Sequence, residues 1–208
     1  MKAVIITPCI SSKIKDVIDI EKEDFVICAD NSFVKALGEN IRIDLIIGDF
    51  DTGTPSAFPI GTEILKFPIE KDDTDTMLCI KEAEKRGFTE IVIVGGLSGR
   101  LDHTFANIQS IAYGKANGLN IKISDGENEV FLIHPGKITL AKKDGFSLSV
   151  FAYGDNVEGV CERGVKYPVE NVALTSSFPL GVSNEIIADE AEISLSKGLL
   201  LIILSKFN

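Results

Sequence analysis

Two carboxylates, one residue apart, follow a short apolar run in the stretch Arg42–Thr52. Asp49 and Asp51 come directly after Leu45–Ile47 and Gly48, and such a run is typical of a buried strand in a parallel sheet. Open α/β sheets bind ligands at the carboxyl ends of their strands. Two carboxylates cannot be buried there without a partner, and Mg²⁺ takes one or two protein carboxylates together with water and phosphate oxygens. The stretch therefore predicts a metal–phosphate site, with a polar strand-to-loop turn as the alternative.

Further carboxylates fall where other strands of the first half end or where the next helices begin. They are Asp30, Asp72 with Asp73 and Asp75, and Asp102. Because these strand ends share one edge of a doubly wound sheet, we expect the carboxylates to converge in space. Each also has a simpler interpretation. Asp30 and Asp102 could serve only as helix-start residues, while Asp72 and Asp75 have the spacing of an N-cap and its third-position carboxylate.

Two cations and a glycine-rich turn could hold phosphates. Lys71 stands just before a predicted helix N-terminus, where a cation opposes the helix dipole and so does not serve helix stability. Gly95, Gly96 and Gly99 precede Arg100; the glycines would let backbone N–H groups approach an anion, and the guanidinium would add a bidentate contact. The spacing is not that of a P-loop. The turn predicts an anion cradle of a different kind.

The elements that carry these residues alternate between strand and helix up to about residue 125. The expected strands are Ala3–Thr7, Phe25–Ala29, Leu45–Ile47, Glu63–Phe67, Ile91–Val94 and Asn120–Ser124; the expected helices are 32–37, about 72–86, and a long one from about residue 100. In the long helix, Leu101, Phe105, Ile108 and Ala112 are predicted to lie along one face. Alternation of this kind predicts an α/β fold with a doubly wound, mostly parallel sheet.

After about Asp125 the pattern changes to short strands separated by turn residues. The expected strands are Val130–Ile133, Lys137–Leu140, Phe146–Phe151, Val157–Cys161, Ala191–Ser196 and Leu199–Leu204. No helical period of useful length appears among them. We therefore predict two domains, an α/β domain over residues 1–125 and a small all-β sandwich or barrel over residues 126–208.

Composition bounds the kind of protein. The chain has 208 residues, 45% of them hydrophobic, and a formal net charge of -10. This charge argues against a general nucleic-acid or anionic-membrane surface. Four separated cysteines and two histidines make a structural zinc site unexpected. No apolar run is long enough to span a bilayer, so we expect a soluble, cytoplasmic protein.

Four motifs together resemble the thiamin pyrophosphokinase (thiamin diphosphokinase) family. They are Gly48–Thr52, Lys71–Asp75, Gly99–His103 with Asn107, and Gly181–Glu185, in matching order and approximate spacing. The resemblance covers essentially the whole chain. It implies transfer of a diphosphoryl group from ATP to the hydroxyl of thiamin, giving thiamin diphosphate and AMP. It also implies a homodimer, with the all-β domain contributing to the thiamin site near the subunit interface.

The resemblance also implies roles for individual residues. By position, Asp49, Asp51 and Asp75 match the Mg²⁺-binding acids; Asp30, Lys71, Thr74 and Arg100 fall on the ATP side; Asp102, Ser183 and Asn184 match thiamin contacts; and Asp49, Asp51, Asp72, Asp75 and Arg100 form the catalytic set. The chain departs from the family pattern where Asn31 and Ser32 replace two glycines, and because it has no Trp on which thiamin could stack.

Three other functions remain open at this point. A haloacid-dehalogenase-like phosphatase would use Asp-x-Asp-x-Thr, but here Thr52 comes one place early. A related diphosphokinase could act on another alcohol such as a pterin. A non-catalytic nucleotide sensor would bind ATP and Mg²⁺ without releasing AMP.

Overall fold

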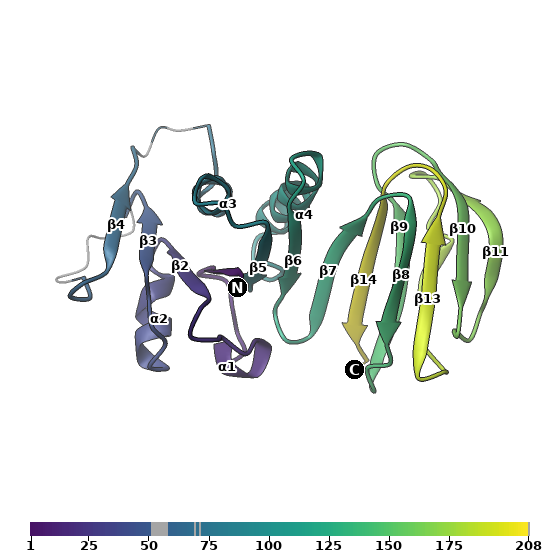
Figure 1. Cartoon of the computed structure of the whole chain (residues 1–208), viewed down its shortest axis with the longest axis horizontal. Helices are drawn as coiled ribbons and strands as arrows, with labels where there is room; N and C mark the ends of the chain where they lie inside the picture. The colour runs from purple at the N-terminus through teal and green to yellow at the C-terminus, as the bar shows by residue number, and fades with distance from the viewer. Residues whose placement is uncertain (51–57, 69, 71, 208) are drawn as a thin grey trace. The chain divides into compact units, whose positions relative to one another are not determined.

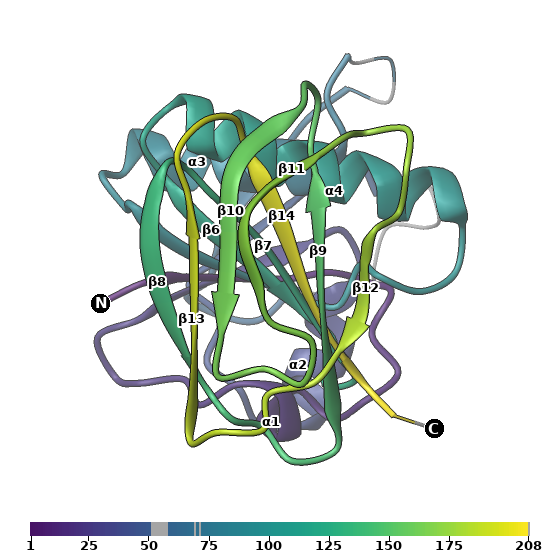
Figure 2. The same cartoon turned by 90° about the vertical axis from the view of Figure 1, so that its right-hand side faces the viewer.

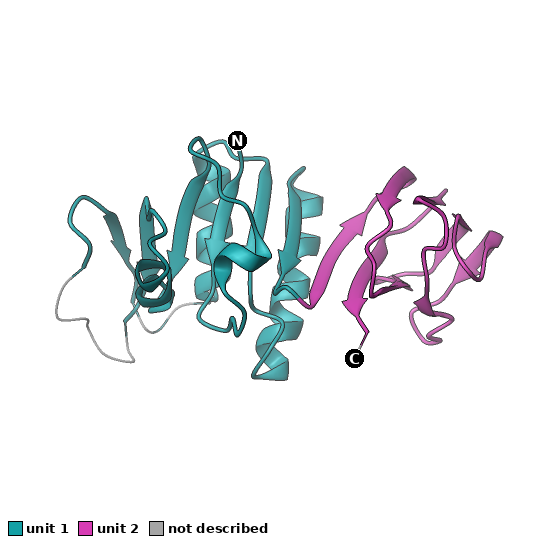
Figure 3. Cartoon of the chain, turned by 90° about the horizontal axis from the view of Figure 1, so that it is seen from below, with its two compact units in different colours: residues 1–126 teal, residues 127–208 magenta. Residues whose placement is uncertain are grey.

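The chain divides into two compact units. Unit 1 is Met1–Gly126 and unit 2 is Glu127–Asn208 (Figure 3). The computed structural model describes residues 1–50, 58–68, 70 and 72–207. None of the helices in these ranges has the length and apolar character required to cross a membrane.

The sheet of unit 1 is parallel and reverses its strand order once. Its strands are β1 (Ala3–Ile6), β2 (Phe25–Ala29), β3 (Leu45–Gly48), β4 (Glu63–Lys66), β5 (Glu90–Val94) and β6 (Asn120–Ser124). They lie in the order β6-β5-β1-β2-β3-β4 (Figure 1), and every neighbouring pair is parallel. The chain builds outward from β1 to β4 and then returns to place β5 on the other side of β1. The switch point, where ligands bind in such sheets, therefore lies between β1 and β5.

Helices cover both faces of this sheet, as right-handed crossovers in two opposite directions require (Figure 3). α1 (Ile14–Val17) and α2 (Ser32–Gly38) lie on one face, and Ile14, Phe33 and Ala36 join a core cluster with side chains of β1, β2 and β3. α3 (Asp75–Lys85) contacts β1, β2 and β3 and packs against α4 (Leu101–Ala116). The predicted doubly wound, mostly parallel sheet is confirmed.

The apolar residues predicted to share one face of α4 are not its most buried residues, and Ile108 and Ala112 are only half-buried. Leu101 and Phe105 are 82% and 58% exposed, whereas the buried residues of the helix are Asn107, Ser110, Ile111 and Gly114. A Cβ at Gly114 would lie 2.3 Å from Cδ1 of Ile121 on β6. The helix thus approaches the sheet closely at Gly114 and buries Ile111 beside it, while Leu101 and Phe105 near its start are left outside.

The first turn of α3 is capped differently from the predicted Asp72–Asp75 arrangement. Thr74 is the N-cap, and its side chain accepts a hydrogen bond of 3.2 Å from the backbone N–H of Met77. Asp72 lies before the cap and is exposed. Thr74 therefore satisfies the helix start, and the Asp75 side chain is not needed for that purpose.

Unit 2 is a sandwich of two sheets (Figure 2). Its strands are β7 (Asn128–Ile133), β8 (Gly136–Ala141), β9 (Phe146–Ala152), β10 (Val157–Arg163), β11 (Val169–Leu174), β12 (Gly181–Asn184), β13 (Glu190–Leu195) and β14 (Leu200–Lys206). One sheet has the order β12-β9-β14-β7 and the other β11-β10-β13-β8, with an apolar core between them. The predicted all-β sandwich is confirmed, but β11 and β12 were not predicted. Both are largely exposed edge strands whose pairing shifts register, so neither shows a regular apolar alternation.

A buried carboxylate fixes the N-terminal edge of the unit 1 sheet. Asp24 is 3% exposed and accepts hydrogen bonds from the backbone N–H of Lys2 at 2.9 Å, the Lys2 ammonium at 2.7 Å and the N–H of Glu21 at 3.0 Å. Burial by itself would raise the pKa of Asp24, but the hydrogen bonds from Lys2 and Glu21 outweigh it, and the pKa lies below its ordinary value.

We predict that Asp24→Asn lowers the free energy of unfolding by about 1.5–3 kcal/mol at pH 7. A depressed carboxyl pKa stabilises the fold above the unfolded-state pKa of about 3.9 and loses that contribution as the pH falls through the folded-state value. The deficit of the variant should therefore shrink below about pH 4, as measured by urea unfolding across this range. The matched control is Asp144→Asn, whose side chain is 92% exposed. A deficit independent of pH would contradict the prediction.

Candidate active site

A cavity of about 300 Å³ lies at the switch point of the unit 1 sheet. It is lined by residues that follow β1, β2 and β5 and by the first turns of α3 and α4: Thr7, Pro8, Cys9, Ala29, Asp30, Thr74, Asp75, Thr76, Gly96, Ser98, His103, Ala106 and Asn107. The cavity therefore collects the carboxyl ends of three strands and the N-termini of two helices.

The glycine turn after β5 is held from three sides. The N–H of Gly95 donates to Ser124 O at 2.8 Å, and the N–H of Gly96 donates to Cys9 O at 2.8 Å. The buried Asn107 side chain on α4 donates through Nδ2 to Gly96 O at 2.9 Å. Because these bonds reach β6, the end of β1 and α4, the turn is a fixed wall of the cavity.

Glycine is required at the first position of this turn. Gly95 has φ +88°, in the left-handed region. A Cβ there would lie 2.6 Å from Oγ1 of Thr7 and 2.7 Å from the backbone oxygen of Cys9. The predicted glycine turn is thus a place where two backbone segments meet with no room for a side chain.

Three of the predicted polar residues line this one cavity, namely Asp30, Thr74 and Asp75. Asp30 has φ +47° and donates its N–H to Ile47 O at 2.7 Å. Its carboxylate Oδ1 would lie 3.3 Å from a Cβ at Gly48. Asp30 therefore lies beside the end of β3 at Gly48. The next residue after Gly48 is the half-buried Asp49. Two other predicted residues, Asp51 and Lys71, lie outside the described residues.

The backbone at these strand ends is strained. Among the described residues, the non-glycine residues with positive φ are Asp30, Asn40, Phe50, Asn171 and Ser183. Asp30 and Phe50 flank the two strand ends of the predicted acidic site, and Ser183 lies in the fourth motif. Such conformations persist only where the surroundings hold them and are common at functional sites. At the Asn31 and Ser32 departure, Ser32 is buried and donates its hydroxyl to Ile6 O at 2.9 Å, which ties the start of α2 to the end of β1.

Arg100, Asp102 and Asp72 are exposed and are not among the residues that line the cavity. The Arg100 guanidinium binds the Asp102 carboxylate in a fork, Nη2 to Oδ2 at 2.5 Å and Nε to Oδ1 at 3.1 Å. This hydrogen bonding holds the pKa of Asp102 below and the pKa of Arg100 above their ordinary values. Both groups are therefore charged and accessible at the start of α4, next to His103, which does line the cavity.

Sequence reasoning missed the end of β1. Thr7, Pro8 and Cys9 line the cavity, and the Thr7 hydroxyl donates to Val94 O at 3.1 Å. This strand end carries no carboxylate, so no acidic pattern marks it as part of a site. The available signal was topological, since the first strand of a doubly wound sheet lies at the switch point.

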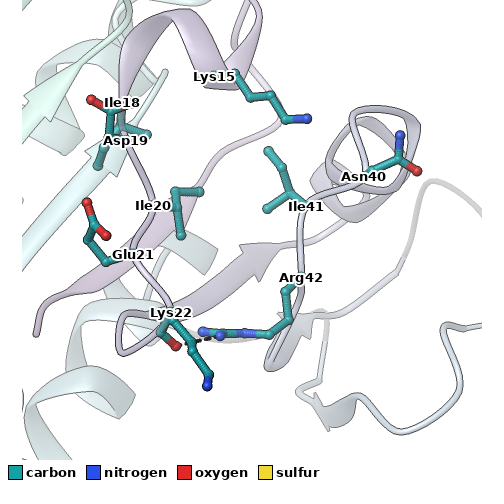
Figure 4. A pocket seen from close by; sticks show the side chains of 9 residues that line it. All are labelled: Lys15, Ile18, Asp19, Ile20, Glu21, Lys22, Asn40, Ile41 and Arg42. Carbon is teal, nitrogen blue, oxygen red and sulfur yellow. Dashed lines mark hydrogen bonds between the residues drawn. The ribbon is translucent and has the colours of Figure 1, made fainter.

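A larger cavity of about 510 Å³ lies at the opposite edge, before β2 and β3 (Figure 4). Its cations include Lys15, Lys22 and Arg42. The Arg42 guanidinium is already engaged by Lys22 O at 2.7 Å and by Asp44 Oδ2 at 3.0 Å. Because ligands of such sheets bind at the carboxyl ends of the strands, the smaller cavity is the candidate active site.

In unit 2 the predicted residues Ser183 and Asn184 lie on β12. Ser183 is exposed and Asn184 is buried. The two therefore cannot play the same part.

Two family models match the chain. The model described as thiamin pyrophosphokinase, catalytic domain, matches residues 19–123, and that described as thiamin pyrophosphokinase, vitamin B1 binding domain, matches residues 137–200. The chain belongs to the thiamin pyrophosphokinase family. Members of this family are enzymes, ATP-dependent diphosphotransferases, and the match favours this family over the phosphatase, the other diphosphokinases and the nucleotide sensor.

Individual relatives agree with the family models. The chain is 30% identical to thiamine pyrophosphokinase of Bacillus subtilis over 140 residues, which span 67% of this chain and 65% of that protein. The crystal structure of the Bacillus subtilis thiamine pyrophosphokinase matches with a TM-score of 0.87 at 25% identity, over 100% of both chains. A thiamin pyrophosphokinase family protein from Enterococcus faecalis matches with a TM-score of 0.87 at 27% identity, also over 100% of both chains.

We predict that Gly95→Ala abolishes most nucleotide turnover, whereas Gly118→Ala does not. Both positions have positive φ, so both substitutions carry a backbone cost of about 1–2 kcal/mol. A Cβ at Gly118 meets nothing within 4 Å, while one at Gly95 meets the end of β1. Steady-state assays of both variants, with unfolding curves to match their stabilities, isolate the effect of the clash. Equal activities would show that the cavity wall does not depend on this close approach.

Proposed function

We propose that this chain is a thiamin diphosphokinase that uses the switch-point cavity of unit 1 for ATP. The observation that carries the proposal is the gathering of Asp30, Thr74 and Asp75 in one cavity with the fixed glycine turn. This arrangement offers backbone N–H groups and helix N-termini for phosphates and carboxylates for a cation. The family matches supply the substrates, thiamin and ATP.

The residues of the cavity suit a polyphosphate that carries Mg²⁺. Mg²⁺ needs only one or two protein carboxylates beside phosphate and water oxygens. Asp30 and Asp75 line the cavity, and Asp49 follows the strand beside Asp30. Among the described residues, which do not include Asp51, no three His, Cys, Asp or Glu side chains group as a metal site. Asp49 and Asp75, both half-buried, would with an incoming triphosphate nevertheless be a suitable donor set.

In the proposed reaction Asp49, Asp51 and Asp75 would hold Mg²⁺, which supplies charge neutralisation to the phosphates. The thiamin hydroxyl oxygen attacks the β-phosphorus of ATP, and the bond from that phosphorus to the α,β-bridging oxygen breaks, so that AMP leaves. Lys71, Thr74 and Arg100 orient the phosphates, and the hydroxyl proton passes to a carboxylate such as Asp72 or Asp102 or to water. Positioning and charge, rather than a strong base, carry most of the rate.

Thiamin recognition is proposed for residues of both units, namely Asp102 in unit 1 and Ser183 and Asn184 in unit 2. Thiamin is a cation, and the formal net charge of -10 attracts it. The exposed Asp102 carboxylate is ionised at neutral pH, as an ordinary Asp is, and the hydrogen bond from Arg100 lowers its pKa further. The proposed location is the cytoplasm, where ATP is available.

A homodimer is proposed through the exposed apolar surface of unit 2. Large apolar side chains are exposed on and around the edge strand β12: Tyr167, Phe178, Leu180, Val182 and Ile187. Apolar patches of this kind commonly mark protein interfaces, and an edge strand such as β12, which pairs with β9 on one side only, invites pairing with a second copy.

The test of the function is incubation of the chain with ATP, Mg²⁺ and thiamin. AMP and thiamin diphosphate should appear in equal amounts, and chelation of Mg²⁺ should stop both. Asp49→Asn should lower kcat by at least about a hundred-fold with the fold intact, because charge neutralisation is lost. Asp16→Asn, an exposed carboxylate on α1, is the control. ADP with thiamin monophosphate, or no thiamin-dependent AMP, would refute the proposal.

For the dimer, light scattering after size exclusion should give twice the mass of one chain. Leu180→Glu should shift the chain to monomers, since it places a charge in the proposed apolar interface. Val34→Glu, on an equally exposed apolar side chain of α2 (61% against 54%), should leave the mass unchanged. A monomeric wild-type chain, or dimers that persist in Leu180→Glu, would count against this interface.

A further inference from the structure

In the motif segment Gly181–Glu185, the exposed Ser183 sits on a strained backbone. Ser183 is exposed and has φ +60°, and its N–H donates to the Ser149 hydroxyl at 3.0 Å. The left-handed conformation costs an L-residue about 1–2 kcal/mol, so neighbouring contacts must hold it.

The neighbouring Asn184 has no hydrogen-bonding capacity left for a ligand. Its Oδ1 accepts from the N–H of Tyr167 at 3.0 Å and the N–H of Glu185 at 2.9 Å. Its Nδ2 donates to Tyr167 O at 3.0 Å and to Glu162 Oε2 at 3.1 Å. Two donors face Oδ1 and two acceptors face Nδ2, so the amide orientation is determined and all four positions are filled.

The fourth partner, Glu162, is a buried carboxyl that the proposed reaction does not use. It lies on β10 with 3% of its surface exposed, and burial raises its pKa although the hydrogen bond from Asn184 opposes this. Burying a carboxyl is costly. An apolar side chain at position 162, like that of the buried Val160 two residues before it, would fill the core at a lower desolvation cost. Core packing therefore does not explain the carboxyl.

The same contacts hold a second loop. Beyond the Asn184–Tyr167 bonds, the N–H of Lys166 donates to Glu185 O at 2.9 Å and the N–H of Ile187 donates to Gly164 O at 3.0 Å. Glu162 thus anchors, through one amide, the junction of the 164–167 loop and the segment that carries Ser183.

We infer that Glu162 and Asn184 are a positioning pair for thiamin: Asn184 acts from inside unit 2, Glu162 fixes it, and the Ser183 hydroxyl makes the polar contact. The inference rests on the proposed function, in which this segment binds thiamin. Glu162 thereby gains a role, and Asn184 supports the segment that carries Ser183 instead of contacting thiamin directly.

The test separates hydrogen bonding from charge and from folding. Glu162→Met removes the acceptor and should raise KM for thiamin by about ten-fold, the scale of one lost hydrogen bond, while KM for ATP stays within about two-fold. Glu162→Gln keeps an acceptor and should remain near wild type. Glu158→Met is the matched control, because Glu158 lies on the same strand but is exposed and paired with Lys197 at 2.8 Å.

A second pair of variants keeps the test decisive if Glu162→Met fails to fold. Asn184→Asp places an oxygen against Glu162 Oε2 and should raise KM for thiamin. Adding Glu162→Gln should recover part of the loss, because the introduced amide can donate to the introduced carboxylate.

An unchanged KM for thiamin in Glu162→Met, or no recovery in the double variant, overturns the positioning pair. A wild-type chain that releases no AMP with thiamin overturns the proposed function instead. The two failures are therefore distinguishable.

Discussion

The close approach of the turn after β5 to the end of β1 is the constraint on which the site depends. Thr7 and Cys9 leave no room for a Cβ at Gly95. The N–H of Gly96 donates to Cys9 O, and the Asn107 side chain donates to Gly96 O. This contact fixes the switch point, and the Asn107 hydrogen bond holds the N-terminal half of α4 against the turn. The strand ends that carry Asp30 and Asp49 are then set by the register of the parallel sheet.

Charge is divided between two environments at this edge of the sheet. Asp30, Asp49 and Asp75 are half-buried, where a cation and phosphates can replace the water they lose. Arg100 and Asp102 pair with one another in solvent, and an exposed pair of this kind contributes little to stability. It can therefore open to a phosphate or a cationic substrate at small cost. A protein with a net charge of -10 can in this way handle a polyphosphate with few cations.

The sequence allowed prediction of the elements whose signal is local. β2 and β6 match the predicted ranges at both ends, because buried parallel strands are short apolar runs bounded by polar residues. The convergence of Asp30 and Asp75 followed from topology. The buried face of α4 could not be predicted from the sequence, because it depends on how closely Gly114 meets β6. The place of Thr7, Pro8 and Cys9 in the cavity could not be predicted either, because these residues have no charge. β11 and β12 were missed because edge strands need no apolar alternation.

The most direct test of the account is a crystal structure of the full chain with Mg²⁺ and α,β-methylene ATP, whose α,β link resists cleavage. The account predicts the triphosphate in the switch-point cavity, against the Gly95–Gly99 turn and the start of α3, with the metal on Asp49 or Asp75. A triphosphate bound elsewhere, for example in the cavity of Lys15, Lys22 and Arg42 at the opposite edge, would contradict it.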